Sequence, residues 1–257
     1  MKIITKSIFT ALLIFLIGCQ NESISELDDF QADVSEDNSS LVNRSGEAIV
    51  NVTHNYQYYG KAFTVTYVFD NESQEILDAY GDLETAEEIF AKEQSPEGTL
   101  VTSKEEETES ITINMMLFDT ANEIDAYLEN TTENAASQLS KNCINGNQPG
   151  VNNVYFFEDI DYNREFTGIR GINKRLHGRQ WLGTENDKIS SFYIQSSERV
   201  QISFYEHSCY TGKRLTFDKG FSQFYGVNNF THYTLSGTWF WRVSWNDQAS
   251  CFWMIER

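Results

Sequence analysis

The chain has 257 residues, of which 14% are aromatic, and this is enough apolar material for one large or two ordinary domains. Its formal charge of −19 is uneven, because residues 20–150 hold 27 acidic against 5 basic side chains, whereas residues 151–257 hold 11 against 12. The acidic half would repel phosphates and the other half has almost no net charge, so no nucleic acid is expected as a partner.

Residues 1–19 have the pattern of an export signal. Lys2 and Lys6 accompany an apolar run, IFTALLIFLIG, which is too short for a comfortable membrane span and leads into LIGC. This ending resembles the lipobox of bacterial lipoproteins, and the resemblance implies a lipid anchor on Cys19. Gln20 is not the aspartate that retains enteric lipoproteins at the inner membrane, so the outer membrane is implied, on either its periplasmic or its outer face. The alternative is a short cleaved signal peptide with an incidental cysteine.

Residues 20–46 follow as an acidic segment with few apolar side chains. Such a composition buries too little surface to offset the entropy of ordering the chain. We therefore predict a disordered tether.

Residues 47–132 are predicted to form a small acidic α+β domain. Two β-rich runs flank YYGK as a hairpin, LETAEEIFAKE has helical spacing, ITINMMLFD is a strand, and TANEIDAYLEN is a helix with Thr120 as N-cap and Glu123 three residues on. The predicted order is β-β-α-β-α. No phosphate-binding, HExxH or GxSxG motif occurs, so no chemistry is assigned. The acids of KEEETES are predicted to be a solvated loop, with cation binding as the alternative.

A polar stretch at residues 133–152, rich in Asn and Gly, is predicted to be a linker. After it, residues 153–257 contain many short apolar runs, several of which alternate strictly, so an all-β domain of two layers is expected. Two patterns occur twice in this domain. Aromatic pairs stand five residues apart at Phe157 and Tyr162 and again at Tyr205 and Tyr210, and NDKISS at 186–191 is followed sixty residues later by NDQASC. The domain is therefore an internal duplication.

These paired signatures resemble those of the βγ-crystallins, whose domains are double Greek-key sandwiches. The resemblance covers residues 153–257. Two positions depart from the pattern: Arg164 stands where the first copy should have glycine, and Cys251 replaces the last serine of the second loop. The whole chain is thus predicted to be multidomain, with a small α+β domain followed by a βγ-crystallin-like sandwich.

The resemblance implies two calcium ions, each held between the two copies. Calcium prefers six to eight oxygen ligands, and NDKIS and NDQAS supply carboxylate, amide, hydroxyl and carbonyl oxygens. By carry-over, site one would use Asp187 with Asn186 nearby, the Lys188 carbonyl, Ser250 and the Glu158 carbonyl. Site two would use Asp247 with Asn246 nearby, the Gln248 carbonyl, Ser190 and the Glu206 carbonyl. One carboxylate per site predicts roughly micromolar to submillimolar affinity, as in extracellular modules.

Three cysteines remain after Cys19, so at least one thiol stays unpaired within the monomer. Cys209 and Cys251 are the first candidates for a disulfide, and Cys143 is the alternative partner. A zinc or nucleophile site from His207 with these cysteines has no supporting spacing. The basic stretch RGINKRLHGR is predicted to be a solvated loop, with an anionic glycan or lipid head group as the alternative ligand.

The expected function is that of a non-enzymatic, calcium-binding lipoprotein whose ions stabilise the crystallin-like domain. The alternative is a carbohydrate- or protein-recognition module at the cell surface, in which calcium is incidental. Its binding platform would be the exposed members of a tryptophan set: Trp239, Trp241, Trp245 and Trp253. Tryptophans buried in the core would not serve this purpose.

Overall fold

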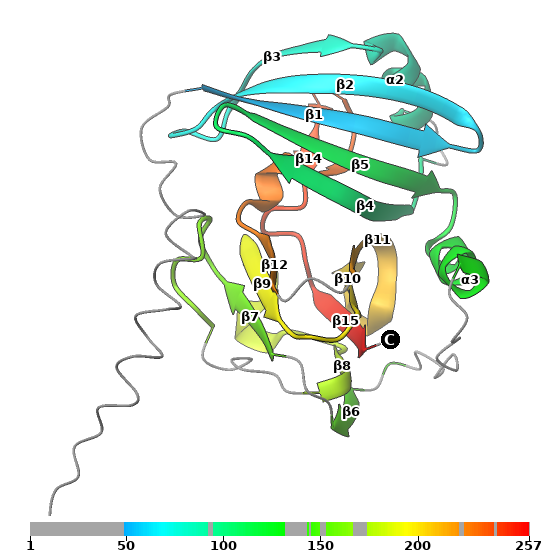
Figure 1. Cartoon of the computed structure of the whole chain (residues 1–257), viewed down its shortest axis with the longest axis vertical. Helices are drawn as coiled ribbons and strands as arrows, with labels where there is room; N and C mark the ends of the chain where they lie inside the picture. The colour runs from blue at the N-terminus through cyan, green and yellow to red at the C-terminus, as the bar shows by residue number, and fades with distance from the viewer. Residues whose placement is uncertain are drawn as a thin grey trace, which may run out of the picture. The chain divides into compact units, whose positions relative to one another are not determined.

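The computed structural model describes residues 49–91, 95–131, 143, 145–149, 153–166, 174–220, 224–238 and 241–256. Within these ranges the chain is mostly β-sheet with two α-helices, arranged as a sheet-rich, sandwich-like fold (Figure 1). The predicted signal peptide, Cys19 and the predicted tether lie outside the described residues. No helix in the described ranges is long and apolar enough to span a membrane.

The predicted hairpin opens the described chain. Strand β1 (Ile49–Tyr58) pairs antiparallel with β2 (Lys61–Asp70), and Tyr59 and Gly60 at the turn both have positive φ, 43° and 82°. Glycine adopts such a turn conformation without steric cost, which explains why YYGK closes the hairpin.

The order of elements then differs from the predicted β-β-α-β-α. The structure has β3 (Ile76–Gly81), α2 (Leu83–Phe90), β4 (Gly98–Glu106), β5 (Ser110–Phe118) and α3 (Ala121–Thr131). Both helices and the strand β5 were predicted, but β3 and β4 were not. β3 is an edge strand with mostly exposed side chains, and β4 ends in the acids that were predicted to be a loop, so neither shows a clear apolar alternation.

Alternation along β1 separates a buried face from a polar one. Val50, Val52, His54 and Tyr56 are buried, whereas the residues between them are only partly covered. The same alternation in β2 and β5 places aromatic and aliphatic side chains on one side of this sheet, where α2 covers them through Ala86, Ile89 and Phe90. The opposite side carries polar residues.

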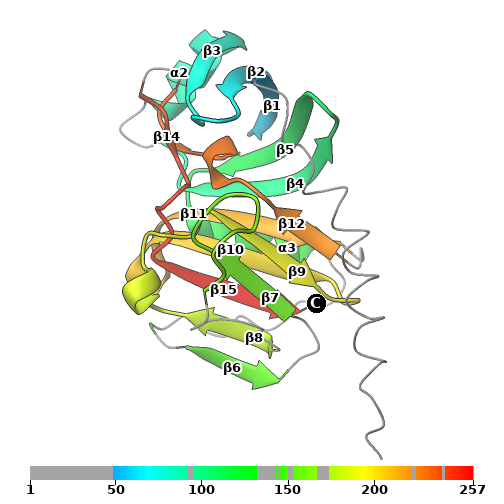
Figure 2. The same cartoon turned by 90° about the vertical axis from the view of Figure 1, so that its left-hand side faces the viewer.

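The second half of the chain builds two packed layers (Figure 2). Strands β7 (Asn153–Phe157), β9 (Ser191–Gln195) and β12 (Phe224–Val227) form a three-stranded sheet. Strands β8 (Lys174–Arg179), β10 (Val200–His207), β11 (Thr211–Lys219) and β15 (Cys251–Glu256) belong to the large sheet. Phenylalanines pack between the layers, with ring centroids 4.7 Å apart for Phe156 and Phe252 and 5.1 Å for Phe192 and Phe204.

The two repeats exchange one strand each. β8 belongs to the first repeat but pairs with β15 of the second, and β12 of the second repeat pairs with β9 of the first. Smaller elements among the described residues of this half are β6 (Gly146–Pro149), β13 (Thr234–Ser236), β14 (Val243–Ser244) and 3-10 turns at Gly183–Glu185, Ser208–Tyr210 and Phe230–His232. β6 lies within the predicted linker and pairs with β8.

A parallel pairing between β4 and β11 joins the two halves into one ten-stranded sheet, with the order β3-β2-β1-β5-β4-β11-β10-β15-β8-β6. Residues 44–257 accordingly group as one compact unit. Arg214 of β11 is buried at this junction. Its guanidinium donates to the Asp125 carboxylate at 2.9 Å and to the Ala121 carbonyl at 3.0 Å, both on α3, and to Ser203 and Thr216.

Replacement of Asp125 by alanine is expected to lower the free energy of unfolding by about 3 kcal/mol, because the buried Arg214 charge would lose its counter-ion. Urea denaturation measures this loss. The exposed pair of Lys61 and Glu88, 3.3 Å apart, is the matched control, and Glu88→Ala should cost less than about 1 kcal/mol. Equal costs for the two variants would contradict the role given to Arg214.

Candidate metal centre

The two loops NDKIS and NDQAS adopt the same backbone conformation. Asp187 and Asp247 have φ of 54° and 55°, in the left-handed region, which Asn and Asp tolerate better than other side chains. Two backbone hydrogen bonds also join the loops. The Asp187 amide donates to the Ala249 carbonyl at 3.2 Å, and the Asp247 amide donates to the Ile189 carbonyl at 3.4 Å. The two loops therefore face each other with matched geometry.

The serines cross between the loops, as the resemblance implies. The Ser250 hydroxyl donates to Oδ1 of Asp187 at 2.9 Å, and the Ser190 hydroxyl donates to Oδ1 of Asp247 at 3.1 Å. Each pair brings a carboxylate of one repeat to a hydroxyl of the other. These are two of the oxygen types that calcium accepts.

Each loop also has a buried amide oxygen with no partner. The side chains of Asn186 and Asn246 donate from Nδ2 to Oδ2 of the following aspartate, at 2.6 and 2.9 Å. Their Oδ1 atoms are buried and accept no hydrogen bond from the described residues. A buried, unpaired acceptor costs free energy, and a bound cation is one way to satisfy it.

The structure reverses the predicted assignment of the two hairpin carbonyls. The Ser190 amide donates to the Phe157 carbonyl at 3.0 Å, which places the hairpin of Glu158 with Ser190 and Asp247, in site two. In the same way the Ser250 amide donates to the Tyr205 carbonyl at 2.9 Å, which places the hairpin of Glu206 in site one. A loop therefore meets the hairpin of its own repeat and the aspartate of the other. Sequence spacing does not distinguish this arrangement from the reverse one.

Lys188 and Gln248, whose carbonyls were the remaining predicted ligands, directly follow the two aspartates in the loops. No group of three or more His, Cys, Asp or Glu side chains that could hold a metal occurs in the described part of the chain. The predicted sites do not require such a group, because each combines one aspartate with amide, hydroxyl and carbonyl oxygens. The residues present therefore fit a weakly charged calcium site.

Loss of solvent around the Asp247 carboxylate raises its pKa, and the nearby acids Glu158, Asp159 and Asp187 raise the pKa further, against the opposing effect of the Ser190 hydrogen bond. Asp159 was not among the predicted site residues, although its place beside Glu158 in the hairpin could have suggested it. Arg164 reaches both hairpin acids, at 3.0 Å from Glu158 Oε2 and 3.5 Å from Asp159 Oδ1. Site two therefore carries more acid than the predicted ligand set showed.

Arg164 keeps the backbone conformation that glycine provides in the other repeat. Its φ is 57°, against 74° for Gly212. Both turns also fold in the same way ahead of this position: the rings of Phe157 and Tyr162 are 5.7 Å apart and those of Tyr205 and Tyr210 are 5.6 Å apart, both edge to face. The missing glycine does not change the fold of the hairpin.

Cys251 makes the same contacts as Ser191, its counterpart in the first repeat. Ser191 Oγ accepts from the Tyr162 amide at 3.2 Å and donates to the Asp159 carbonyl at 2.7 Å. Cys251 Sγ accepts from the Tyr210 amide at 3.3 Å and donates to the His207 carbonyl at 3.1 Å. The thiol thus replaces the serine hydroxyl in fastening the hairpin turn.

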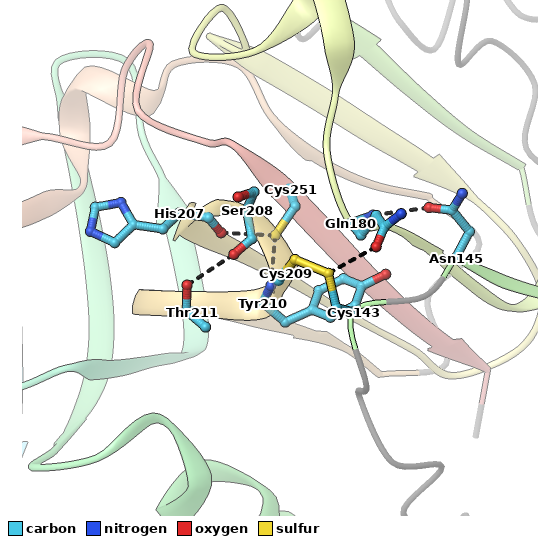
Figure 3. Close-up of a disulfide and its surroundings, with 9 residues drawn as sticks. All are labelled: Cys143, Asn145, Gln180, His207, Ser208, Cys209, Tyr210, Thr211 and Cys251. Carbon is cyan, nitrogen blue, oxygen red and sulfur yellow. Dashed lines mark hydrogen bonds between the residues drawn. A yellow bond between two sulfur atoms is a disulfide. The ribbon is translucent and has the colours of Figure 1, made fainter.

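The disulfide joins Cys143 to Cys209, with Cα atoms 4.3 Å apart (Figure 3). The first predicted pair, Cys209 with Cys251, was wrong. The reason is that the Cys251 sulfur lies buried against the turn, where it makes the two hydrogen bonds above, and it is the free cysteine among the described residues. Burial raises the pKa of the Cys251 thiol to about 12, so it stays protonated and unreactive near neutral pH.

Comparison of the chain with known protein families, curated proteins and solved structures finds no match.

Cys251→Ser is expected to leave the melting temperature nearly unchanged, because the hydroxyl can make both hydrogen bonds, as Ser191 does. Cys251→Val should cost about 1–3 kcal/mol, because the buried Tyr210 amide would lose the hydrogen-bond acceptor that Cys251 provides. Thermal and urea unfolding of the two variants measure the difference. Equal stability of the valine and serine variants would show that the thiol only fills space.

The raised pKa of Asp247 predicts opposite effects of acid on the calcium-free and calcium-bound states. In the folded chain its pKa lies above the unfolded value, so this group contributes stability at low pH that is lost as the pH rises through the folded pKa. Calcium requires the ionised form. The increase in melting temperature caused by calcium should therefore shrink as the pH falls from 7 toward roughly 4.

Melting curves with calcium and with chelator across this pH range make the measurement. Asp247→Asn is the control, since it removes the titrating group and should leave a smaller, less pH-dependent calcium effect. A calcium effect in the unmodified chain that stays constant down to the acid end would contradict the assignment of Asp247 as a ligand.

Proposed function

We propose that this chain is a non-enzymatic, calcium-binding lipoprotein with a βγ-crystallin-like double Greek-key domain at residues 153–257. The observation that carries the proposal is the crossed geometry of the two loops. Each aspartate meets the serine of the other repeat, at 2.9 and 3.1 Å, beside a buried asparagine oxygen that has no partner among the described residues.

The proposed binding sites hold two ions. Site one has Asp187, Asn186, the Lys188 carbonyl, Ser250 and the hairpin of Glu206. Site two has Asp247, Asn246, the Gln248 carbonyl, Ser190 and the hairpin of Glu158. The exchange of β8 and β12 between the sheets supports the Greek-key assignment, because it relates the two repeats by an approximate two-fold symmetry.

Calcium has a structural role in this proposal. A ligand that binds the folded chain and not the unfolded one stabilises the fold in proportion to the logarithm of its concentration over its dissociation constant. In each site the ion would connect the two repeats, since its ligands come from both. It would also relieve the repulsion between Asp247 and the neighbouring acids.

The location in this proposal rests on the N-terminal sequence alone. The lipobox-like LIGC supports attachment through Cys19 to the outer membrane of a bacterium, where calcium at extracellular concentrations could fill sites of modest affinity. The division of residues 47–132 and 153–257 into two domains belongs to the same proposal. They would be domains that share a sheet through β4 and β11.

The second candidate function, recognition of a carbohydrate or protein by tryptophans, retains a smaller platform than expected. Trp245 and Trp253 are buried, with 1% and 3% of their surface exposed, whereas Trp241 is 74% exposed. Trp239 lies outside the described residues. Trp181, which was not in the predicted set, is 63% exposed and is a further candidate for such a contact.

Calorimetric titration of calcium into the chelator-stripped full chain tests the proposal. We expect saturable binding of about two ions with a dissociation constant roughly in the micromolar to submillimolar range, and a melting temperature that rises with calcium and returns with chelator. The Asp187→Ala/Asp247→Ala variant should lose both effects.

Glu185→Ala is a matched control, because Glu185 is an acid in the same loop region that contributes no proposed ligand. It should bind as the unmodified chain does. Absence of binding heat and of any change in melting temperature in the unmodified chain would reject the calcium function and leave the loops as a folding feature.

A further inference from the structure

A groove of about 630 Å³ lies on the polar face of the N-terminal sheet. This volume falls in the range of small-molecule binding sites, roughly 300–1,000 Å³. Its lining comes from β1, β2, β4, β5, the start of α2 and the helix α3, and includes Asn55, Gln57, Thr64, Asp82, Asn114 and Tyr127. Figure 1 shows the four strands side by side, with α3 following β5. None of these residues belongs to the proposed calcium sites.

A ladder of hydrogen bonds forms one row of the floor. Thr64 Oγ1 donates to Asn55 Oδ1 at 3.0 Å, Asn55 Nδ2 donates to Asn114 Oδ1 at 3.0 Å, and Asn114 Nδ2 donates to Ser103 Oγ at 2.7 Å. These four residues are direct partners across β2, β1, β5 and β4. The side chains are therefore held in fixed positions, at the strand spacing of about 4.8 Å.

The ladder uses only some of the hydrogen-bond donors and acceptors of each side-chain amide. A side-chain amide has two N–H donors and an oxygen with two lone pairs, and the ladder takes one donor and one lone pair from Asn55 and from Asn114. Each amide thus keeps a donor and an acceptor next to each other. Such a pair can bond to two adjacent hydroxyl groups of one ligand.

A less polar row runs beside the ladder. Ala62, Gln57 and Met116 are partners across β2, β1 and β5, and all three line the groove. Tyr127 of α3 adds an aromatic side chain at the β5 side. The groove therefore offers apolar surface next to a line of amides, as a ligand with both C–H faces and hydroxyl edges requires.

The charge of the groove favours a neutral ligand. Asp82 is the charged residue in its lining, and its carboxylate accepts from the Thr64 amide at 2.8 Å. Residues 47–132, which include all the residues that line the groove, hold 19 acidic against 3 basic side chains, so their field repels anions. For a cation the lining offers one carboxylate, that of Asp82, and this carboxylate already accepts a hydrogen bond.

We propose that this groove binds a neutral oligosaccharide, with the amides of Asn55, Gln57 and Asn114 bonded to sugar hydroxyls and Tyr127 and Met116 packed against the C–H face of the ring. This inference is independent of the calcium sites, because the groove shares no residue with them. It gives the N-terminal half, which has no catalytic motif, a binding role.

The test is calorimetric titration of the full chain, in chelator, with neutral hexasaccharides of β-1,4-glucose, α-1,4-glucose, β-1,4-mannose and β-1,4-xylose. Hexagalacturonate is the anionic control. We expect saturable binding of at least one neutral sugar and none of the anionic one. Binding in the presence of chelator separates this result from the calcium function.

Two variants locate the site. Asn55→Ala/Asn114→Ala should weaken sugar binding at least about tenfold, equivalent to about 1.4 kcal/mol. Gln57→Ala leaves the ladder intact and should weaken binding while the melting temperature stays the same. Thr112→Ala is the matched control, since Thr112 lies on the same face of β5 but outside the groove.

The proposal is overturned if none of the four neutral sugars binds. It is also overturned if Gln57→Ala and Thr112→Ala bind sugar equally, since binding would then lie elsewhere on the chain, for example at Trp181 or Trp241. Preferential binding of hexagalacturonate would overturn the neutral class.

Discussion

The exchange of β8 and β12 between the two sheets is the constraint on which the second half of the chain depends. Neither repeat completes its own sheet, because β8 of the first repeat pairs with β15 of the second and β12 of the second repeat pairs with β9 of the first. This pairing brings the loops at 186–190 and 246–250 face to face and crosses Ser190 to Asp247 and Ser250 to Asp187. The oxygen-rich sites are thus a product of the fold as a whole, and a single repeat would present half of each.

The same exchange requires a glycine at one position of β8 and one of β12, because a hairpin tyrosine packs closely on each of them. A Cβ at Gly178 would collide with Trp253 and the Tyr210 hydroxyl, and one at Gly226 would collide with the Tyr162 hydroxyl. Each hairpin tyrosine therefore packs on a glycine in the strand that its own repeat receives from the other. Ser191 and Cys251 then fasten the same turns. The tyrosine and Ser/Cys positions that repeat in the sequence thus make the same contacts in both repeats.

Much of this arrangement could be predicted from residue patterns, and the rest could not for physical reasons. The hairpin at Tyr59 and Gly60, both helices and the two loops depend on local chemistry, so the sequence indicated them. β3 and β4 lack apolar alternation because one lies at an edge and the other ends in acids. The β4–β11 pairing joins residues 116 positions apart (214 − 98 = 116), the Cys143–Cys209 disulfide joins residues 66 positions apart, and no local pattern encodes either. The contact of each hairpin with the loop of its own repeat likewise depends on the fold and not on a local pattern.

The disulfide has a consequence for the order in which the two repeats can come apart. It closes a covalent ring from 143 to 209 that contains β6, the described strands of the first repeat (β7, β8 and β9) and β10 of the second repeat, while β11, β12 and β15 lie outside it. A ring of this length lowers the entropy of the unfolded chain by an amount worth about 4 kcal/mol. The first repeat is therefore held in a closed loop that cannot extend to its full length, whereas the second repeat beyond β10 is an open chain end. Two repeats of nearly the same structure thus differ in how far their chains can extend when they unfold.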